Sequence, residues 1–222
     1  MKVIVFDTET TGLPEDYTAS FKDSSKWPHI IQLAFIVFDT ETKEILDYSD
    51  KIIKLDQSVQ ISSESIAIHK ITRERSEKEG IPIKNVLDYF INWLTDVDII
   101  IAHNISFDKR MVIVESYRNQ IQNVFVNKDG RQMKEYCTMK NSTNICKIKT
   151  INKRTGTTYN KFPSLSELHT YLFEVAPKGT HNAIADVMIC LRCYIKLTDL
   201  YDIVSDKKVI LVFQALFNSY CL

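Results

Sequence analysis

Short apolar runs, separated by polar segments, divide the chain into predicted strands and helices. Lys2–Phe6 is rich in β-branched and aromatic residues, which predicts a buried strand that ends at Asp7. The runs Ile30–Phe38 and Ile45–Leu55 predict two more strands, and the few polar residues between them predict an antiparallel hairpin. The remaining predicted strands are Asp98–Ala102 and Met133–Met139.

Apolar residues at helical spacing predict the helices. The clearest stripe lies in Ile83–Leu94. Because a strand hairpin is followed by alternating helices and strands, the order of elements predicts an α/β domain built around a mixed sheet. The other predicted helices are Ser62–Ile68, Ser106–Tyr117, Ser164–Phe173 and Ala183–Leu197.

The length of 222 residues is typical of one domain that buries a sizeable core. We expect a single domain over residues 1–222, with a core at about 2–200 and a C-terminal helical segment at about 207–222. Apolar residues at helical spacing predict that this segment packs on its own domain. These residues are Val209, Val212, Phe213, Leu216 and Tyr220.

The 28 basic and 28 acidic side chains give a net charge of zero. Overall charge therefore does not favour a polyanionic partner, and affinity for nucleic acid must come from a local patch. Lys140–Lys161 is the candidate, because this segment holds six basic residues and no acid. Any single lysine in it is expected to lie in a solvated, partly disordered loop, whereas the basic residues as a group favour contact with nucleic acid.

The five cysteines are odd in number and irregularly spaced, so we expect reduced thiols rather than a disulfide framework. The chain opens without a signal-peptide pattern, and no apolar run reaches the roughly 18 to 20 residues of a membrane helix. These features predict a soluble intracellular protein, cytoplasmic or nuclear, with no membrane partner.

The hexapeptide Val-Phe-Asp-Thr-Glu-Thr occurs twice, at residues 5–10 and 37–42. In the first copy, Asp7 and Glu9 lie two positions apart at a predicted strand end, so their side chains point to the same side of the sheet. Carboxylate oxygens placed in this way suit Mg²⁺ or Mn²⁺. An Asp-x-Glu pair alone is weak evidence, because it more often marks a solvated turn.

Two further motifs hold polar residues at the starts of predicted helices. Ala102–Asp108 lies where a strand turns into a helix, a position at which α/β folds build their sites. His181–Asp186 precedes another predicted helix. Taken singly, Asn104 could cap its helix and Asp108 could be a first-turn acid. The three motifs together, in this order, instead indicate one metal site.

These motifs resemble those of a known enzyme family over about residues 2–200. The set of motifs is similar to that of the DEDDh branch of the DnaQ-like 3′→5′ exonucleases. It consists of Asp7-x-Glu9 followed by Thr-Thr-Gly-Leu, then His-Asn-x-x-Phe-Asp, then His-x-Ala-x-x-Asp. That family includes polymerase proofreading subunits, RNase T, oligoribonuclease and the TREX enzymes. The resemblance implies an RNase H-like fold, in which a mixed central β-sheet is flanked by α-helices.

The resemblance also implies the chemistry. A two-metal-ion mechanism would hydrolyse phosphodiester bonds at the 3′ end of single-stranded nucleic acid and release nucleoside 5′-monophosphates. The ions would be Mg²⁺, with Mn²⁺ able to substitute. His181 would be the general base, because an imidazole can accept a proton near neutral pH. The implied metal ligands are Asp7, Glu9, Asp108 and Asp186. These four acids and His181 are the implied catalytic residues.

Other residues are candidates for substrate binding. Gly12 would let the backbone approach the terminal nucleotide, and Leu13 would wedge beside the last base by analogy with the family. Phe107 could stack on the same nucleotide or belong to the core. Basic residues of the 140–161 segment could bind phosphates. The remaining predicted substrate contacts are Thr10, Asn104, Lys147, Lys149, Lys153 and Arg154.

Three readings of the function stay open. The first is an exonuclease that acts on single-stranded 3′ ends, with DNA favoured over RNA. Its candidate partners are a polymerase or a second copy of the chain. A catalytically silent binding subunit with the same fold and a metal-dependent endonuclease are the others; an RNA-trimming exoribonuclease is a variant of the first. For the second hexapeptide, the surrounding residues predict a surface turn rather than a site.

Overall fold

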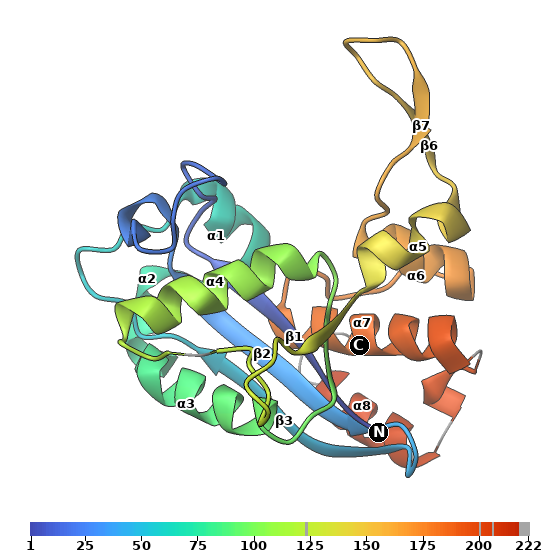
Figure 1. Cartoon of the computed structure of the whole chain (residues 1–222), viewed down its shortest axis with the longest axis horizontal. Helices are drawn as coiled ribbons and strands as arrows, with labels where there is room; N and C mark the ends of the chain where they lie inside the picture. The colour runs from blue at the N-terminus through green and yellow to red at the C-terminus, as the bar shows by residue number, and fades with distance from the viewer. Residues whose placement is uncertain (123, 200, 206, 218–222) are drawn as a thin grey trace.

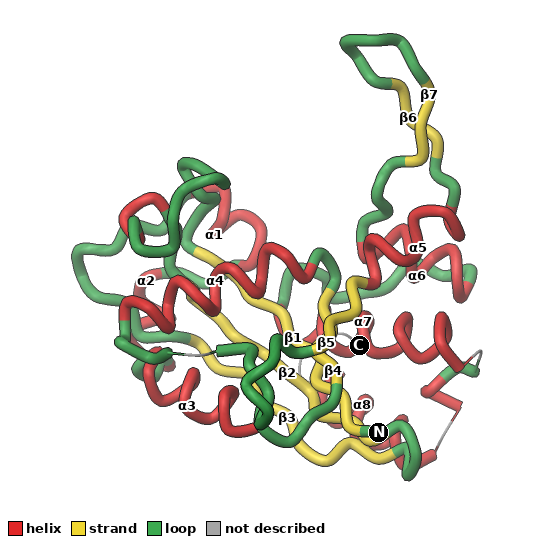
Figure 2. Tube along the Cα trace, in the orientation of Figure 1, coloured by secondary structure: helices red, strands yellow, loops and turns green. Residues whose placement is uncertain are grey.

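The computed structural model describes residues 1–122, 124–199, 201–205 and 207–217 (Figures 1 and 2). A five-stranded sheet with the order β3-β2-β1-β4-β5 lies at its centre. β1 runs antiparallel to β2 and parallel to β4, so the sheet is mixed, as predicted. The five strands are β1 (Lys2–Thr10), β2 (Ile30–Asp39), β3 (Glu44–Ile52), β4 (Ile99–Ala102) and β5 (Lys134–Cys137).

Helices cover both faces of the sheet (Figure 1). Residues of β1 alternate between the faces: Ile4 and Phe6 pack with α3 and α4, whereas Val3 and Val5 pack with α7 and α8. The helices are α1 (Ser63–His69), α2 (Arg73–Glu79), α3 (Ile83–Leu94), α4 (Ile105–Arg118), α5 (Thr138–Cys146), α6 (Leu165–Phe173), α7 (Ala183–Asp199) and α8 (Lys207–Phe217), with short 3₁₀ turns at Ser24–Lys26 and Ile203–Ser205.

The prediction that the first strand ends at Asp7 is wrong, because β1 continues to Thr10. β2 keeps pairing along this stretch, and Glu9 lies opposite Gln32. β4 follows β1 only as far as Val5. Beyond that residue one edge of β1 is not paired with β4, which leaves backbone groups there for side chains from other elements.

The predicted strand Met133–Met139 is wrong at both ends. β5 is shorter, and α5 begins at Thr138. The α5 sequence has low helix propensity, but Thr138 and Ser142 are fully buried, so tertiary packing stabilises the helix. The expected partly disordered loop is also wrong: after α5, β6 (Lys149–Ile151) and β7 (Thr158–Asn160) form a hairpin that projects from the molecule (Figure 2).

No apolar stripe marks α2, which buries only Ser76 among its residues. Its start is fixed locally, because the backbone N–H of Arg75 donates to the Thr72 hydroxyl at 3.3 Å. α8 packs on its own domain through Val209 and Phe213, as predicted. Tyr220 and the side chain of Leu216 lie outside the described residues.

The structure bears on the predicted free thiols and on the predicted lack of a membrane helix. In the part of the chain that the structure describes, four cysteines are free thiols, three of them buried. Over those same residues, no helix combines the length and apolar content that crossing a membrane requires.

Candidate active site

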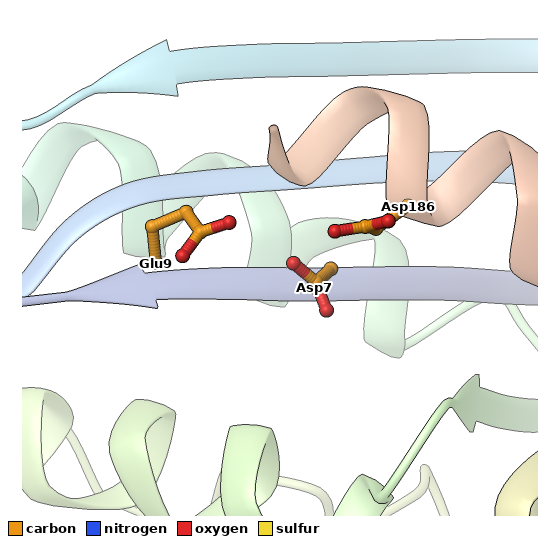
Figure 3. Close-up of side chains that lie close together, drawn as sticks. All are labelled: Asp7, Glu9 and Asp186. Carbon is orange, nitrogen blue, oxygen red and sulfur yellow. The ribbon is translucent and has the colours of Figure 1, made fainter. Parts of the chain in front are cut away.

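The first and third sequence motifs meet on one face of the sheet. Asp7 and Glu9 alternate with Thr8 along β1 and therefore lie on the face that packs on α7. Asp186 lies in the first turn of α7. Carboxylate oxygens of the three residues lie within 4.8 Å of one another (Figure 3).

Asp108 approaches the same strand from α4. Its Oδ1 accepts hydrogen bonds from the Thr8 backbone N–H at 3.0 Å and from the Thr8 hydroxyl at 2.8 Å. Thr8 lies beyond Val5, the last residue of β1 that is paired with β4, so Asp108 satisfies a backbone donor that the shorter strand leaves available. Asp108 is buried, and its charge acts on Asp7.

Burial is the largest cause of raised pKa values in all four acids. It raises the pKa of Glu9 to about 8, with added repulsion from Asp186 and Asp108. The pKa values of Asp108 and Asp186 rise to about 7, and that of Asp7 rises well above its usual range. Four neighbouring acids that resist ionisation in this way are a fitting site for divalent cations, which stabilise the charged form.

These shifts predict how pH affects stability. A raised pKa means that the folded state binds protons more tightly than the unfolded state, whose carboxyl pKa is about 4. Stability from these acids is fully present below about pH 4 and is lost as pH rises through folded values of about 7 to 8. In EDTA the melting temperature should therefore fall between pH 5 and 8, and Mg²⁺ should restore it most at pH 8.

The matched control is the double variant Asp7→Asn with Glu9→Gln, which keeps the shape of the site and removes two of its charges. Thermal unfolding of both proteins, followed in EDTA and in Mg²⁺, should show a shallower pH dependence and a smaller response to Mg²⁺ in the variant. Identical melting curves in EDTA and Mg²⁺ at pH 8 for the wild type would contradict a cation site.

His181 lies in the exposed loop before α7. Its backbone N–H donates to Asp186 Oδ2 at 3.0 Å, and its φ of 70° is a left-handed conformation that is uncommon outside glycine. The predicted base is thus fixed beside Asp186 through its backbone.

A cleft of about 560 Å³ opens beside Glu9, between the segment after β1, helix α1 and Phe107. Leu13 is 74% exposed on it, as a wedge residue would be. A Cβ on Gly12 would meet no protein atom within 4 Å, so the space next to this backbone is open. Phe107 both lines the cleft and packs on the core, and Thr10 donates to the Gly12 carbonyl at 2.7 Å.

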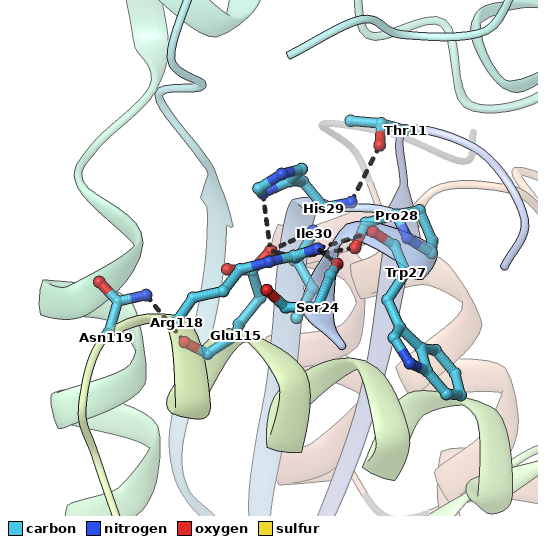
Figure 4. A network of polar contacts seen from close by, with 9 residues as sticks. All are labelled: Thr11, Ser24, Trp27, Pro28, His29, Ile30, Glu115, Arg118 and Asn119. Carbon is cyan, nitrogen blue, oxygen red and sulfur yellow. Dashed lines mark hydrogen bonds and ion pairs between the residues drawn. The ribbon is translucent and has the colours of Figure 1, made fainter. Parts of the chain in front are cut away.

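Ion pairs on the buried Glu115 hold the far end of the loop that leaves β1 (Figure 4). Glu115 Oε1 lies 2.7 Å from Arg118 Nη1 and 3.1 Å from His29 Nδ1. The backbone N–H of His29 in turn donates to the Thr11 hydroxyl at 3.0 Å. Through this network, α4 fixes the loop that carries Gly12 and Leu13.

The sequence profile of the RNase T-type exonuclease family matches residues 4–194 of the chain. The chain belongs to this exonuclease family. Its motifs assign it to the DEDDh-type, DnaQ-like branch, and its sheet and helices form the RNase H-like fold of that branch. None of the curated proteins compared matches the sequence.

Solved structures share the fold of this exonuclease-family chain. Apo exonuclease I is 15% identical with a TM-score of 0.63, and the match covers 97% of this chain and 44% of that one. E. coli exonuclease I with a dT13 oligonucleotide is 16% identical, with a TM-score of 0.63 and coverages of 97% and 43%. A 3′-exonuclease that recognises a histone mRNA stem-loop is 13% identical, with a TM-score of 0.63 and coverages of 89% and 64%. The chain spans less than half of the exonuclease I structures.

Two polar residues between β4 and α4 of the exonuclease fold differ in role. Asn104 is left-handed, with a φ of 67°, and its side chain does not cap α4 but accepts from Ser106 at 3.2 Å. His103 contacts Thr138 Oγ1 through Nδ1 at 2.9 Å and the Pro163 carbonyl through Nε2 at 3.1 Å. Burial lowers the pKa of His103 to about 4, so its ring is neutral and structural.

The structure does not bring the predicted basic residues into the cluster formed by Asp7, Glu9 and Asp186. Lys147 ends α5, Lys149 lies in β6, and Lys153 and Arg154 lie in the turn between β6 and β7. All four are exposed.

Sequence reasoning missed two residues that position the exonuclease-family motifs. Thr8 holds Asp108, although it stands between the two acids of the first motif. Gln32 is buried; its Nε2 donates to Asp50 at 2.7 Å, and its Oε1 accepts from the Ala183 N–H at the start of α7, at 3.4 Å. The available signal was one polar residue inside an otherwise apolar strand.

The second hexapeptide folds differently from the first. Asp39 ends β2, and its Oδ1 accepts from the Glu41 N–H in the turn at 2.9 Å. This hydrogen bond is the largest cause of the lowered pKa of Asp39, whereas the pKa of Asp7 is raised. The same letters thus give a solvated turn in one place and a half-buried acid cluster in the other.

Proposed function

We propose that this chain is a metal-dependent 3′→5′ exonuclease that shortens single-stranded nucleic acid. The convergence of Asp7, Glu9 and Asp186 within 4.8 Å is the observation that carries the proposal. Membership of the exonuclease family and the open cleft beside Glu9 support it. The exposed Leu13 at that cleft favours action at a strand end.

The donor set fits the implied cofactor. Carboxylate oxygens are hard ligands, which suit Mg²⁺ or Mn²⁺. When bound, two such ions would stabilise the negative charge that develops during displacement at phosphorus. Asp7, Glu9 and Asp186 would hold them, and Asp108 would contribute Oδ2, since Thr8 occupies its Oδ1.

His181 would accept the proton of the attacking water. As the water oxygen bonds to phosphorus, the bond to the 3′ oxygen of the preceding nucleotide breaks, and that oxygen takes up a proton from solvent to become a new 3′ hydroxyl. The products are a nucleoside 5′-monophosphate and a strand shorter by one nucleotide. Leu13 and Phe107 would orient the terminal base, while Thr10, Gly12 and Asn104 would contact its sugar and phosphate.

We favour DNA as the substrate, with an RNA-trimming exoribonuclease as the alternative. The long basic insertion is more typical of proofreading and TREX relatives than of compact oligoribonucleases. Exonuclease I binds a dT13 oligonucleotide on this fold, whereas the 3′-exonuclease recognises a histone mRNA stem-loop. The fold therefore accommodates both sugars.

Incubation with 5′-labelled single-stranded DNA and RNA of the same sequence, in Mg²⁺ or EDTA, tests the proposal. We expect a ladder that shortens from the 3′ end, requires Mg²⁺ and forms faster on DNA. Internal cuts would indicate an endonuclease, and no cleavage of either strand would indicate a silent binding subunit. Faster shortening of RNA would reverse the assigned preference.

A further inference from the structure

Residues 147–161 form a protruding hairpin, here named the arm. β6 and β7 pair only with each other, as a separate two-stranded sheet among the described strands. Thr150 lies opposite Tyr159, and the backbone N–H of Lys161 donates to the Ile148 carbonyl at 2.9 Å. The arm rises from α5 and α6, well clear of the sheet and its helices (Figures 1 and 2).

The tip of the arm has a defined turn. Asn152 Oδ1 accepts from the backbone N–H groups of Arg154 and Thr155, at 2.9 and 3.2 Å. Gly156 has a φ of 70°, which favours glycine, and its N–H donates to the Asn152 carbonyl at 2.8 Å. These bonds hold the tip in one shape and present Lys153 and Arg154 to solvent.

The charge of the arm is entirely of one sign. Between Thr138 and Pro163 the chain has six basic residues and no acidic one. Lys161 pairs with Glu167 at the base, at 2.6 Å, so its charge is largely offset there. The other arm cations are exposed, on a protein whose net charge is zero. The arm is therefore a local basic patch that favours binding of a polyanion. They are Lys147, Lys149, Lys153 and Arg154.

Exposed apolar side chains lie among these cations. Tyr159 is 49% exposed on β7, and Phe162, next to the base of the arm, is 56% exposed. Aromatic faces interleaved with cations are typical of surfaces that bind single strands, because bases stack on the rings while the cations follow the phosphates.

The base of the arm is fastened to the candidate active site. His103 directly follows β4 and contacts Thr138 at the start of α5 and Pro163 just after the arm. Five positions further along, Asp108 holds Thr8 of β1. The same short segment therefore connects the acidic site with both ends of the insertion that carries the arm.

We propose that the arm binds the part of the single strand that lies upstream of the 3′ terminus, and so makes the enzyme selective for long strands. A strand rises about 3.3 Å per residue, so the arm extends on the order of 20 Å from base to tip. This is about six nucleotides of a stacked strand, at about 3.4 Å each. The inference rests on the proposed function, which places the 3′ end beside Asp7, Glu9 and Asp186.

The test compares a trinucleotide with a strand of about 20 nucleotides, which is long enough to cover the arm. In the arm variant all four exposed cations become glutamine: Lys147→Gln, Lys149→Gln, Lys153→Gln and Arg154→Gln. We expect its preference for the long strand, measured as the ratio of kcat/KM values, to fall about tenfold or more. The slope of log KM against log salt should fall by about 3, since each phosphate contact on a single strand contributes about 0.7.

A second variant replaces residues 149–160 with Asn-Gly, which suits a two-residue turn between the paired Ile148 and Lys161. It should show the same loss of preference. The charge-matched control removes four exposed lysines from the opposite edge of the sheet and from α2 and α3, and should keep the wild-type preference. Its changes are Lys51→Gln, Lys54→Gln, Lys78→Gln and Lys84→Gln.

An unchanged preference in both arm variants, or equal losses on the two strands, would overturn the proposal. If the wild type cleaves neither strand, the proposed function fails, and equilibrium binding of the long strand in EDTA tests the arm separately. Binding that is weakened in the arm variant but not in the control would uphold the arm as a single-strand site. Equal binding by all three proteins would overturn it and point to a protein partner or a second copy of this chain.

Discussion

The double variant Asp7→Ala with Glu9→Ala is expected to lose exonuclease activity by about 10³-fold or more, equivalent to at least about 4 kcal/mol of transition-state stabilisation. Both side chains lie on the α7 face of β1, and their carboxylate oxygens and one of Asp186 lie within 4.8 Å of one another. Their removal would leave Asp186 and Asp108 without the two ligands that complete the site. Time courses on 5′-labelled single strands in Mg²⁺ measure the loss.

Asp39→Ala with Glu41→Ala is the matched control, because it changes the same letters of the same hexapeptide. Asp39 bonds the backbone of its own turn, so full activity is expected. The active-site variant should also remain folded and melt no lower than the wild type in EDTA, because burial raises the pKa of both acids and disfavours their charge. Equal activity losses in the two double variants would overturn the assignment of the site to the first copy.

The hydrophobic pattern was sufficient to predict the central sheet. β2 is apolar at nearly every position because both of its faces are covered, and the hairpin to β3 follows from the short polar break. The order of elements then implied a mixed α/β fold. The predicted end of β1 was wrong because an apolar run stops at Phe6, whereas a strand continues as long as a neighbour pairs with it.

The elements that were missed depend on contacts that are distant in sequence. α5 is stable because Thr138 and Ser142 are buried by helices that follow later in the chain. Gln32 bonds Ala183, which lies 151 positions away. Neither partner can be identified from the local pattern of either residue, so sequence reasoning found the acids of the site but not the residues that position them.

Replacing His181 with asparagine is expected to lower kcat by about 10²- to 10⁴-fold, the usual contribution of a general base. Asparagine is the informative choice. It tolerates the left-handed conformation found at His181 and keeps the backbone N–H that bonds Asp186. The substitution therefore removes the imidazole and leaves the polar contacts of the loop in place.

A structural role and a catalytic role for His181 predict different responses in this variant. If the ring accepts the proton of water, the variant should retain the Mg²⁺-dependent rise in melting temperature and the wild-type KM, and added imidazole should restore part of kcat. If His181 acts only through its backbone, activity should be unchanged, since the bond to Asp186 persists. Loss of the response to Mg²⁺ together with activity would instead mean that the ring supports the metal site, and His181 would no longer be assigned as the base.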